Sequence, residues 1–504
     1  MVELDGYHLT LEQLAALADG TERAALASDA RRRTAAARAV VDRALEGDDP
    51  VYGVNTGFGS FAEVRIAHAD LSELQINLLR SHAAGVGDPL PIRTVRAAMA
   101  LRANVLARGC SGIRVELIDA LIALLNAGVH PVIPSRGSVG ASGDLAPLAH
   151  LALVLVGEGA ALFQDRALVG ADALRAAGLQ PVRLEPKEGL ALINGTQPSA
   201  AVLALSLLDA ERLARTADVA AAMSIDALRG STRPFDRRIH EARGFRGQSQ
   251  AAATIARLMD GSAINASHAN CGRVQDAYSM RCAAQVHGAT REALAWIRRT
   301  VETEANAATD NPMVFTEPDD IVSGGNFHGA PLALAADFMA IAVTHLATIS
   351  ERRTERLVNP ALSGLPAFLT TNGGVQSGLM MAHVSSAALT SELKTLAHPA
   401  SVDTIPTSGN KEDHVSMSMT AALKAERAVS LVRQVLAIEF LCAAQALDLL
   451  APLTTSPPLT RVHEAIRARV GTLRADRPPS PDIRAIDVLI ADGDLERAAE
   501  VAAN

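Results

Sequence analysis

The sequence is short of aromatic residues, of cysteine and of positive charge, and each shortage excludes a class of protein. Aromatic residues make up only 3% of the 504 residues, so a large core must be filled mainly by Ala, Leu and Val, as in closely packed helices. The net charge is -8 at pH 7, with no sustained basic stripe. This balance argues against nucleic acid as the main partner.

The spacing of cysteine and histidine predicts neither disulfides nor a metal site. The four cysteines include no CxxC pair, and the 14 histidines include no HExxH motif and no pair four residues apart. The amino terminus, MVELDGYHLT, lacks the basic and apolar regions of a signal peptide. We therefore expect a cytoplasmic protein in a reducing environment, without a bound metal.

One apolar stretch, PLALAADFMAIAVTHLATIS from Pro331, comes close to the length of a membrane span. Asp337 and His345 interrupt it, and the charged stretch ERRTER follows. A buried helix of a large bundle is therefore the better interpretation, and we expect no membrane association.

Helical periodicity is what the sequence has in abundance. Hydrophobic residues make up 49% of the chain, and they recur with the helical period over runs far longer than the typical helix of about 11 residues. These runs cover about 197–228, 282–309, 331–357 and 416–450. The prediction is a mainly all-α fold, built on a long bundle of antiparallel helices.

Shorter elements fill the rest of the chain. ALFQDRALVG and PMVFTEPDDIVSGG each predict a small β-hairpin rather than the core of a sheet. Asp70 and Glu73 form a capping pair for a helix that runs toward His82. Proline-rich TTSPP and RPPSP bracket a more polar stretch near the end. We therefore expect an N-terminal region 1–195, a long-helix bundle 196–450 and a peripheral helical tail 451–504.

The stretch SVGASGDLAPLAH, residues 138–150, is too rich in small residues to pack well and too poor in charge to be a solvated loop. It lacks the lysine of a phosphate-binding loop and misses the G-x-S-x-G register of a hydrolase by one residue. GFGSFA from Gly57 matches a loose dinucleotide pattern, but no alternation of strands and helices follows it. In isolation, 138–150 would be a glycine turn that caps a helix.

Eight separated motifs, in one order over nearly the whole length, make the chain similar to the aromatic amino acid ammonia-lyases. They are VYGVNTGFGS, RSHAAGVG, GSVGASGDLAPLAH, KEGLALINGTQ, STRPFDRRIHEARG, VQDAYSMRC, SGGNFH and KEDHVSM. In that family an Ala-Ser-Gly tripeptide cyclises and loses water to give a methylidene-imidazolone (MIO), an electrophile made from the chain. The resemblance implies an MIO formed from Ala141, Ser142 and Gly143, with no external cofactor.

The residue types suit that chemistry. Minimal side chains on either side of Ser142 allow the amide nitrogen of Gly143 to attack the carbonyl of Ala141. By resemblance, Tyr52 is the general base for the β-proton and Arg281 binds the substrate carboxylate. A phenol with an ordinary pKa of about 10 must be partly ionised by its surroundings to act near neutrality.

Four further residues match polar or aromatic positions of the family's site. Asn194, Gln275 and Tyr278 resemble the groups around the ring and the amino group, and Phe327 resembles the aromatic residue that packs near the ring. The alternatives are local backbone hydrogen bonding for Asn194 and Gln275, a half-buried structural tyrosine for Tyr278, and a core position for Phe327.

Substrate choice rests on His82 and Glu412. The resemblance is closest to the members that act on histidine, so we expect elimination of ammonia from L-histidine to give trans-urocanate. Relatives acting on phenyl or phenol rings usually carry Gln where this chain has Glu412, and a carboxylate can accept an imidazole N–H. Pairing of Glu412 with Lys411 or His414 would be a structural alternative. Action on tyrosine or phenylalanine, or as an aminomutase, remains open.

The resemblance also implies a homotetramer in which three subunits contribute to each site. Long helices with extended apolar faces fit such an assembly. Two residues depart from the pattern: Ala277 stands where Pro is usual, and His383 where Gln is common. A lyase of the fumarase and argininosuccinate class would need a Gly-Ser-Ser loop, which the sequence lacks. Intact Tyr52, Ser142 and Arg281 argue against an inactive scaffold.

Overall fold

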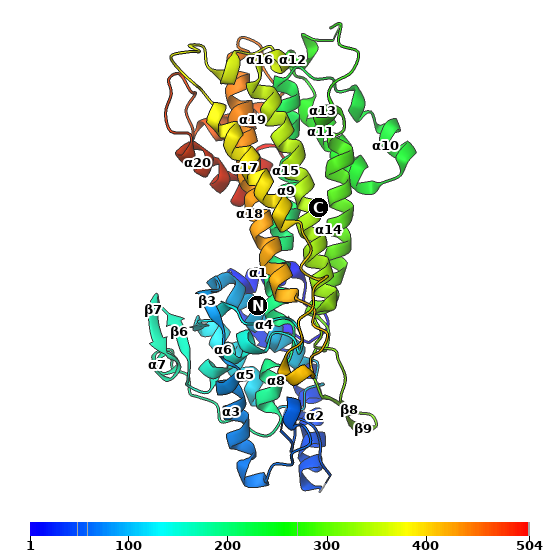
Figure 1. Ribbon diagram of the computed structural model, residues 1–504, viewed down its shortest axis with the longest axis vertical. Helices are drawn as coiled ribbons and strands as arrows, with labels where there is room; N and C mark the ends of the chain where they lie inside the picture. The colour runs from blue at the N-terminus through cyan, green and yellow to red at the C-terminus, as the bar shows by residue number, and fades with distance from the viewer. Residues whose placement is uncertain (48, 58, 270, 502–504) are drawn as a thin grey trace. The chain divides into compact units, whose positions relative to one another are not determined.

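The computed structural model describes residues 1–47, 49–57, 59–269 and 271–501, and its fold is mainly α-helical, as predicted (Figure 1). The chain forms two compact units, each made of segments from different parts of the sequence. Unit 1 comprises Met1–Leu205, Arg298–Ala336 and Pro399–Leu423. Unit 2 comprises Ser206–Ile297, Asp337–His398 and Lys424–Asn504. This division differs from the three consecutive regions that the sequence suggested.

The four long periodic runs form the four longest helices, with ends within a few residues of those predicted. They are α9 (Gln197–Ala227), α14 (Ala283–Ala305), α15 (Ala330–Val358) and α18 (Ser418–Leu449). The boundary between the units falls within each of them. Because the boundary lies inside helices, consecutive sequence regions could not reproduce it.

Most of these four helices belongs to unit 2, where alanine dominates the buried positions. Ala220, Ala221 and Ala222 on α9 and Ala443 and Ala444 on α18 are fully buried. Small side chains let helix backbones approach closely, as the low aromatic content predicted.

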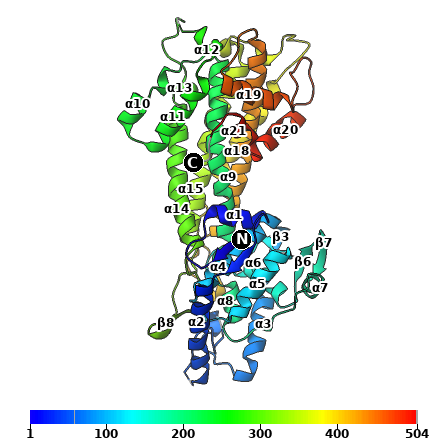
Figure 2. The same ribbon diagram turned by 180° about the vertical axis from the view of Figure 1, so that it is seen from behind.

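Shorter helices complete unit 2, and the predicted tail, 451–504, lies in this unit (Figure 2). They are α10 (Arg237–Arg243), α11 (Arg246–Met259), α12 (Ala263–Ala266), α13 (Tyr278–Arg281), α16 (Pro360–Ser363), α17 (Met380–Leu396), α19 (Pro457–Arg467), α20 (Ser480–Ala491) and α21 (Asp494–Ala498).

Unit 1 is organised around α4 (Ile92–Ala107), which is buried along nearly its whole length and contacts α1 (Leu11–Ala18) and α5 (Val115–Ala127). A second group is formed by three helices that contact one another, α3 (Leu71–His82), α6 (Leu145–Leu155) and α8 (Glu188–Ile193). The unit also contains α2 (Ser28–Glu46) and α7 (Gly170–Ala176). The glycine-rich stretch leads directly into α6.

Strands are short, and the largest sheet among the described residues has three of them, β4 (His130–Pro131), β6 (Ala160–Phe163) and β7 (Arg166–Val169). Both predicted hairpins are confirmed: β6 pairs with β7, and β8 (Met313–Thr316) with β9 (Asp319–Val322). The other pairs are β1 (Val2–Leu4) with β2 (Ala24–Leu26), β3 (Val86–Pro89) with β5 (Pro134–Arg136), and β4 with β6.

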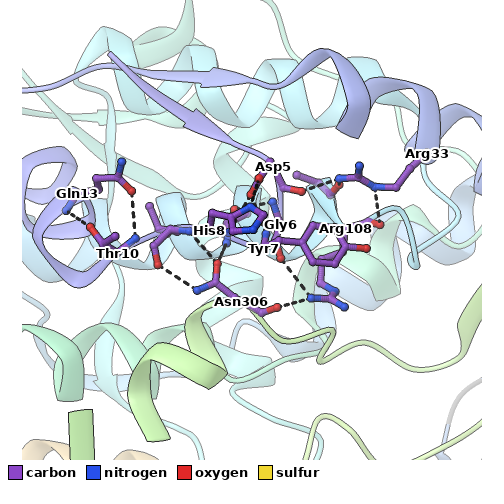
Figure 3. A network of polar contacts seen from close by, with 12 residues as sticks. Asp5, Gly6, Tyr7, His8, Thr10, Gln13, Arg33, Arg108 and Asn306 are labelled. Atoms are coloured by element: carbon purple, nitrogen blue, oxygen red, sulfur yellow. Dashed lines mark hydrogen bonds and ion pairs between the residues drawn. The ribbon is translucent and has the colours of Figure 1, made fainter. Parts of the chain in front are cut away.

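A polar network ties the N-terminal segment to residue 306 and so joins two distant parts of unit 1 (Figure 3). The side chain of Asn306 accepts a hydrogen bond from the Leu9 amide at 2.9 Å, and its backbone carbonyl accepts one from Arg108 at 2.5 Å. The Tyr7 ring lies near two guanidinium groups, 4.2 Å from Arg108 and 5.0 Å from Arg33. Cation–π attraction of this kind stabilises the exposed loop.

The predicted helix ending at His82 is present as α3, but its predicted cap is wrong in detail. Asp70 precedes the helix without a side-chain capping hydrogen bond. Its backbone is already in the right-handed helical region and ends a short 3₁₀ turn, His68–Asp70. A capping side chain normally needs an extended backbone, which Asp70 lacks.

Two helices, α15 and α18, are long and apolar enough to cross a membrane by length and composition alone. The most apolar windows are 67% and 83% buried within the protein. Core helices of large bundles pass the same test, so these two features do not by themselves indicate a membrane protein.

Candidate active site

The tripeptide Ala141-Ser142-Gly143 is pressed against a second glycine. Gly143 has a positive φ of 70°, and it forms an isolated parallel bridge with Gly195. The next amide, of Asp144, donates to the Gly195 carbonyl at 2.7 Å. A Cβ atom on Gly143 would overlap that carbonyl. Only glycine therefore fits at 143, both for its backbone angle and for the close approach.

Hydrogen bonds hold both ends of the tripeptide. Ser138 Oγ accepts from the Gly140 amide at 3.0 Å and donates to the Asp144 carboxylate at 2.5 Å. Ser199 donates to the same carboxylate through its amide and its hydroxyl, at 2.7 and 2.9 Å. Burial raises the pKa of Asp144, and these hydrogen bonds oppose the rise. The backbone between 138 and 144 is thus held in one conformation.

The hydroxyl of Ser142 points at a carboxylate. Its Oγ donates to Oε1 of Glu412 at 2.6 Å, while Oε2 of Glu412 accepts from Thr407 Oγ1 at 2.6 Å and Ser408 Oγ at 2.8 Å. Burial disfavours ionisation of Glu412, but these three hydrogen bonds and the nearby His82 keep its pKa below the ordinary value. Glu412 is therefore an oriented, ionised carboxylate.

Glu412 does not pair with Lys411 or His414, the alternative that the sequence left open. Its three hydrogen-bonded partners are hydroxyl groups rather than Lys411 or His414. The His414 ring instead stacks on the His328 ring, with centroids 5.8 Å apart and planes at 3°. The carboxylate is therefore directed toward the tripeptide.

Tyr52 is half-buried in the same unit, and the local environment raises the pKa of its phenol. Burial is the main cause, the charge of Glu412 adds to it, and a backbone hydrogen bond at Gly59 works against it. This differs from the expectation that the surroundings ionise the phenol. Within unit 1, Tyr52 is held mainly in its protonated form near neutral pH.

His82 is the last residue of α3, and one of its ring nitrogens is hydrogen-bonded to the helix backbone. Its Nδ1 lies 2.8 Å from the Leu78 carbonyl oxygen and 3.1 Å from Ser81 Oγ. Because a carbonyl oxygen only accepts, Nδ1 must carry the hydrogen. In the neutral ring, Nε2 is then left with a lone pair. His82 also contributes to the low pKa of Glu412, so the two side chains interact electrostatically.

Asn194 and Phe327 also belong to unit 1. Asn194 follows α8 and donates through Nδ2 to the Asn311 carbonyl at 2.9 Å, while its Oδ1 is buried with no protein partner among the described residues. The alternative of backbone hydrogen bonding thus holds for the NH₂ group of Asn194 but not for its Oδ1. Phe327 is half-buried, two residues before Gly329, whose amide donates to the Gly140 carbonyl at 3.2 Å.

The other three predicted residues belong to unit 2. Gln275 is exposed, and Tyr278, at the start of α13, is 70% exposed. The guanidinium carbon of Arg281 lies 4.6 Å from the centre of the Tyr278 ring. Unit 1 therefore brings together Tyr52, His82, Ser142 and Glu412, and within unit 2 Arg281 lies against Tyr278.

The structure places both residues that depart from the family pattern. Ala277 precedes α13 with φ of -63°, the angle that proline imposes, so alanine preserves the same backbone course. His383 on α17 pairs through Nε2 with the Glu351 carboxylate of α15 at 2.9 Å. Burial opposes ionisation of Glu351, but Arg352 and His383 keep its pKa below the ordinary value.

Sequence reasoning missed several residues that support the site. Ser138, Asp144 and Ser199 hold the tripeptide, and Thr407 and Ser408 orient Glu412. Ser138 and Asp144 stand inside the motif GSVGASGDLAPLAH, which was an available signal, whereas Ser199, Thr407 and Ser408 lie just outside the quoted motifs. Among the described residues, no group of three His, Cys, Asp or Glu side chains could hold a metal ion.

Comparisons with known proteins agree over nearly the whole chain. The aromatic amino acid lyase family model matches residues 9–468. The histidine ammonia-lyase of Anaeromyxobacter sp. (strain K) is 58% identical over 502 residues, covering 98% of this chain and 99% of that protein. That of Koribacter versatilis is 54% identical over 511 residues, covering 99% of each.

Solved structures share the fold as well. The structure of histidine ammonia-lyase from Trypanosoma cruzi has a TM-score of 0.91 and 44% identity, covering 99% of this chain and 94% of that one. Tyrosine aminomutase from Streptomyces globisporus has a TM-score of 0.94 and 37% identity, covering 99% and 98%.

Proposed function

The chain belongs to the aromatic amino acid lyase family, and on that premise we propose that it eliminates ammonia from L-histidine to give trans-urocanate. The observation that carries the proposal is the oriented, ionised Glu412 beside Ser142. Relatives named histidine ammonia-lyase at 51% to 58% identity support the same substrate.

The residues around the tripeptide fit an MIO built from it. Ala141 is small and buried, Gly143 tolerates no side chain, and Gly195 presses on the backbone that would close into the ring. When formed, the ring supplies an electrophile that ordinary side chains cannot provide. Intact mass should show a deficit of two waters without any added cofactor, and Ser142→Ala should abolish both the deficit and nearly all activity. Fully active protein of undiminished mass would refute the ring.

The side chains of unit 1 have complementary tasks in this reaction. Tyr52 accepts the β-proton of the substrate, and its raised pKa makes the phenolate scarce but strongly basic. Glu412 accepts the imidazole N–H of the substrate, with Thr407 and Ser408 preventing its rotation. His82 packs beside the substrate imidazole, and the buried Oδ1 of Asn194 is available to a donor of the substrate.

We further propose that Arg281, Tyr278 and Gln275 reach the site from other copies of the chain, in a homotetramer with three subunits at each site. The exposed Tyr278 and Gln275 support this arrangement. So does a set of exposed apolar side chains on α14, α15 and α17, which includes Trp296, Phe338, Leu334, Ile341, Met381 and Val384. A fork-shaped guanidinium such as that of Arg281 suits a carboxylate ligand.

Incubation of the purified protein with L-histidine, L-tyrosine and L-phenylalanine separately tests the function. Release of ammonia and urocanate from histidine alone would support the proposal. Faster turnover of tyrosine or phenylalanine would contradict the assigned substrate, and a β-amino acid product would identify an aminomutase. The four free cysteines support a cytoplasmic location, and a role in histidine catabolism follows from the proposed reaction.

A further inference from the structure

Arg102 is a fully buried cation that the proposed reaction does not use. It lies on α4, at the centre of unit 1, with no exposed surface. Burial lowers its pKa to about 10, which leaves the guanidinium charged at neutral pH. Burying a charged group is costly unless its hydrogen-bonding capacity is used. The contacts of Arg102 therefore indicate what it stabilises.

Arg102 binds the carbonyl end of α8 and the first residue of α9. Its Nη1 donates to the Asn194 carbonyl at 2.9 Å and to Gln197 Oε1 at 2.6 Å, and its Nη2 donates to the Ala191 carbonyl. The last carbonyls of a helix have no partner within the helix, and a cation there is favourable. Gln197 is braced in turn, since its Nε2 donates to Thr309 Oγ1 at 2.8 Å.

The segment held by Arg102 is the one that presses on the tripeptide. Gly195 follows Asn194, and a Cβ atom on Gly195 would overlap Nη1 of Arg102. The Gly195 carbonyl accepts the Asp144 amide at 2.7 Å, and Gly195 is bridged to Gly143. Gly195 therefore contacts the guanidinium through its Cα and the tripeptide through its peptide group. No atom of Arg102 is in hydrogen-bond contact with residues 141–143.

We propose that Arg102 is a positioning residue for formation of the ring, acting through the Asn194–Gly195 backbone. This inference rests on the proposed function, because it requires that residues 141–143 cyclise. The guanidinium fixes Gly195, and Gly195 prevents the Gly143 backbone from moving away from the Ala141 carbonyl. Without the guanidinium, the end of α8 relaxes and the approach of nitrogen to carbon is lost.

The chemistry needs no other reactant. A bond forms between the Gly143 nitrogen and the Ala141 carbonyl carbon. One water leaves with the Ala141 oxygen and the hydrogens of the Gly143 and Ser142 amides. A second leaves with the Ser142 hydroxyl and the hydrogen on its Cα. Because atoms and electrons balance within the tripeptide, geometry is what the surroundings must contribute.

The same helix supplies a matched control. Arg96, six residues before Arg102, also donates to backbone carbonyls, those of Leu17, Ala18 and Leu125. None of these three adjoins the tripeptide in sequence. Arg96→Met and Arg102→Met therefore both remove a carbonyl-binding guanidinium from α4, but only the second releases Gly195.

The test follows ring formation by intact mass during cell-free synthesis, on the folded fraction, with thermal unfolding measured in parallel. We expect Arg102→Met to slow the appearance of the two-water deficit by roughly 10- to 100-fold, as a misplacement of about 1 Å does to an oriented reaction. Arg102→Lys keeps the positive charge but not the forked guanidinium, so its rate of ring formation should lie between those of the wild type and Arg102→Met. Arg96→Met should lower the melting temperature but leave ring formation at the wild-type rate.

The outcomes separate the two proposals. Absence of the deficit in wild-type protein would contradict the ring and the proposed function. A wild-type deficit that appears equally fast in folded Arg102→Met would overturn the role of Arg102 alone, as would equal slowing in Arg96→Met. If Arg102→Met fails to fold, Gln197→Met can be used instead, because it removes one partner of the guanidinium and leaves the charge. An unchanged rate of ring formation in both Gln197→Met and Arg102→Lys would also overturn the role of Arg102.

Discussion

Ser142 Oγ donates to Glu412 Oε1 at 2.6 Å, across a separation of 270 residues in the sequence. The contact joins the serine predicted to become part of the electrophile to the carboxylate predicted to recognise the substrate ring. Loss of the serine hydroxyl as water would free Oε1, while Thr407 and Ser408 continue to hold Oε2. Glu412 would then be an oriented acceptor without its present partner.

Glu412→Gln should depress activity on L-histidine far more than any residual activity on L-phenylalanine. The amide is a weaker acceptor for the imidazole N–H, and a mismatched half-buried polar group costs about 1 to 3 kcal/mol, or roughly 5- to 150-fold in discrimination. The measurement is kcat/KM for both substrates. Lys411→Gln, next in sequence and exposed, serves as the control and should leave the ratio unchanged. An equal loss on both substrates would contradict the specificity role of Glu412.

The same substitution should lower the pKa of Tyr52. Burial raises that pKa and the negative charge of Glu412 raises it further, so removing the charge favours the phenolate while burial still opposes it. The chain has three tyrosines, so Tyr7→Phe with Tyr278→Phe leaves Tyr52 alone for an absorbance titration of the phenolate. Its midpoint should lie above that of free tyrosine and move down in Glu412→Gln. An upward shift would contradict the electrostatic account.

Gly143→Ala should prevent formation of the ring, because its methyl group would overlap the Gly195 carbonyl. Gly128 has a similar positive φ of 74° but nothing within 4 Å of a Cβ atom. Gly128→Ala therefore measures the backbone strain alone, about 1 to 2 kcal/mol. Denaturant unfolding should show a larger loss of stability for Gly143→Ala than for Gly128→Ala. Intact mass should show the two-water deficit in Gly128→Ala but not in Gly143→Ala. Equal effects of the two substitutions would show that the close approach of Gly143 to the Gly195 carbonyl does not matter for ring formation.

Co-expression of Tyr52→Phe with Arg281→Met should restore activity that neither variant has alone. If Tyr52 and Arg281 of one site come from different chains, an equal mixture leaves about a quarter of the sites with both residues intact. Light scattering should show a tetramer in each case. Activity no greater than the sum of the two parents would place both residues of a site in one chain.

Much of the fold follows from the sequence because its signals are local. The helical period persists through α9, α14, α15 and α18, so their ends were predicted within a few residues. Turn residues between β-branched and aromatic stretches likewise located both hairpins. Family motifs identified the tripeptide and the residues around it. The cap at Asp70 failed because its backbone angle depends on the turn before it, which composition does not reveal.

Tertiary structure decided which atoms meet and how each group is charged. The sequence by itself determined that the chain is helical, that small residues flank Ser142 and that a carboxylate stands at 412. Only the fold placed Gly195 against Gly143, directed three hydroxyl groups to Glu412 and buried Tyr52 so that its pKa rises. Such effects depend on distance and desolvation between residues far apart in the chain, and no local pattern encodes them.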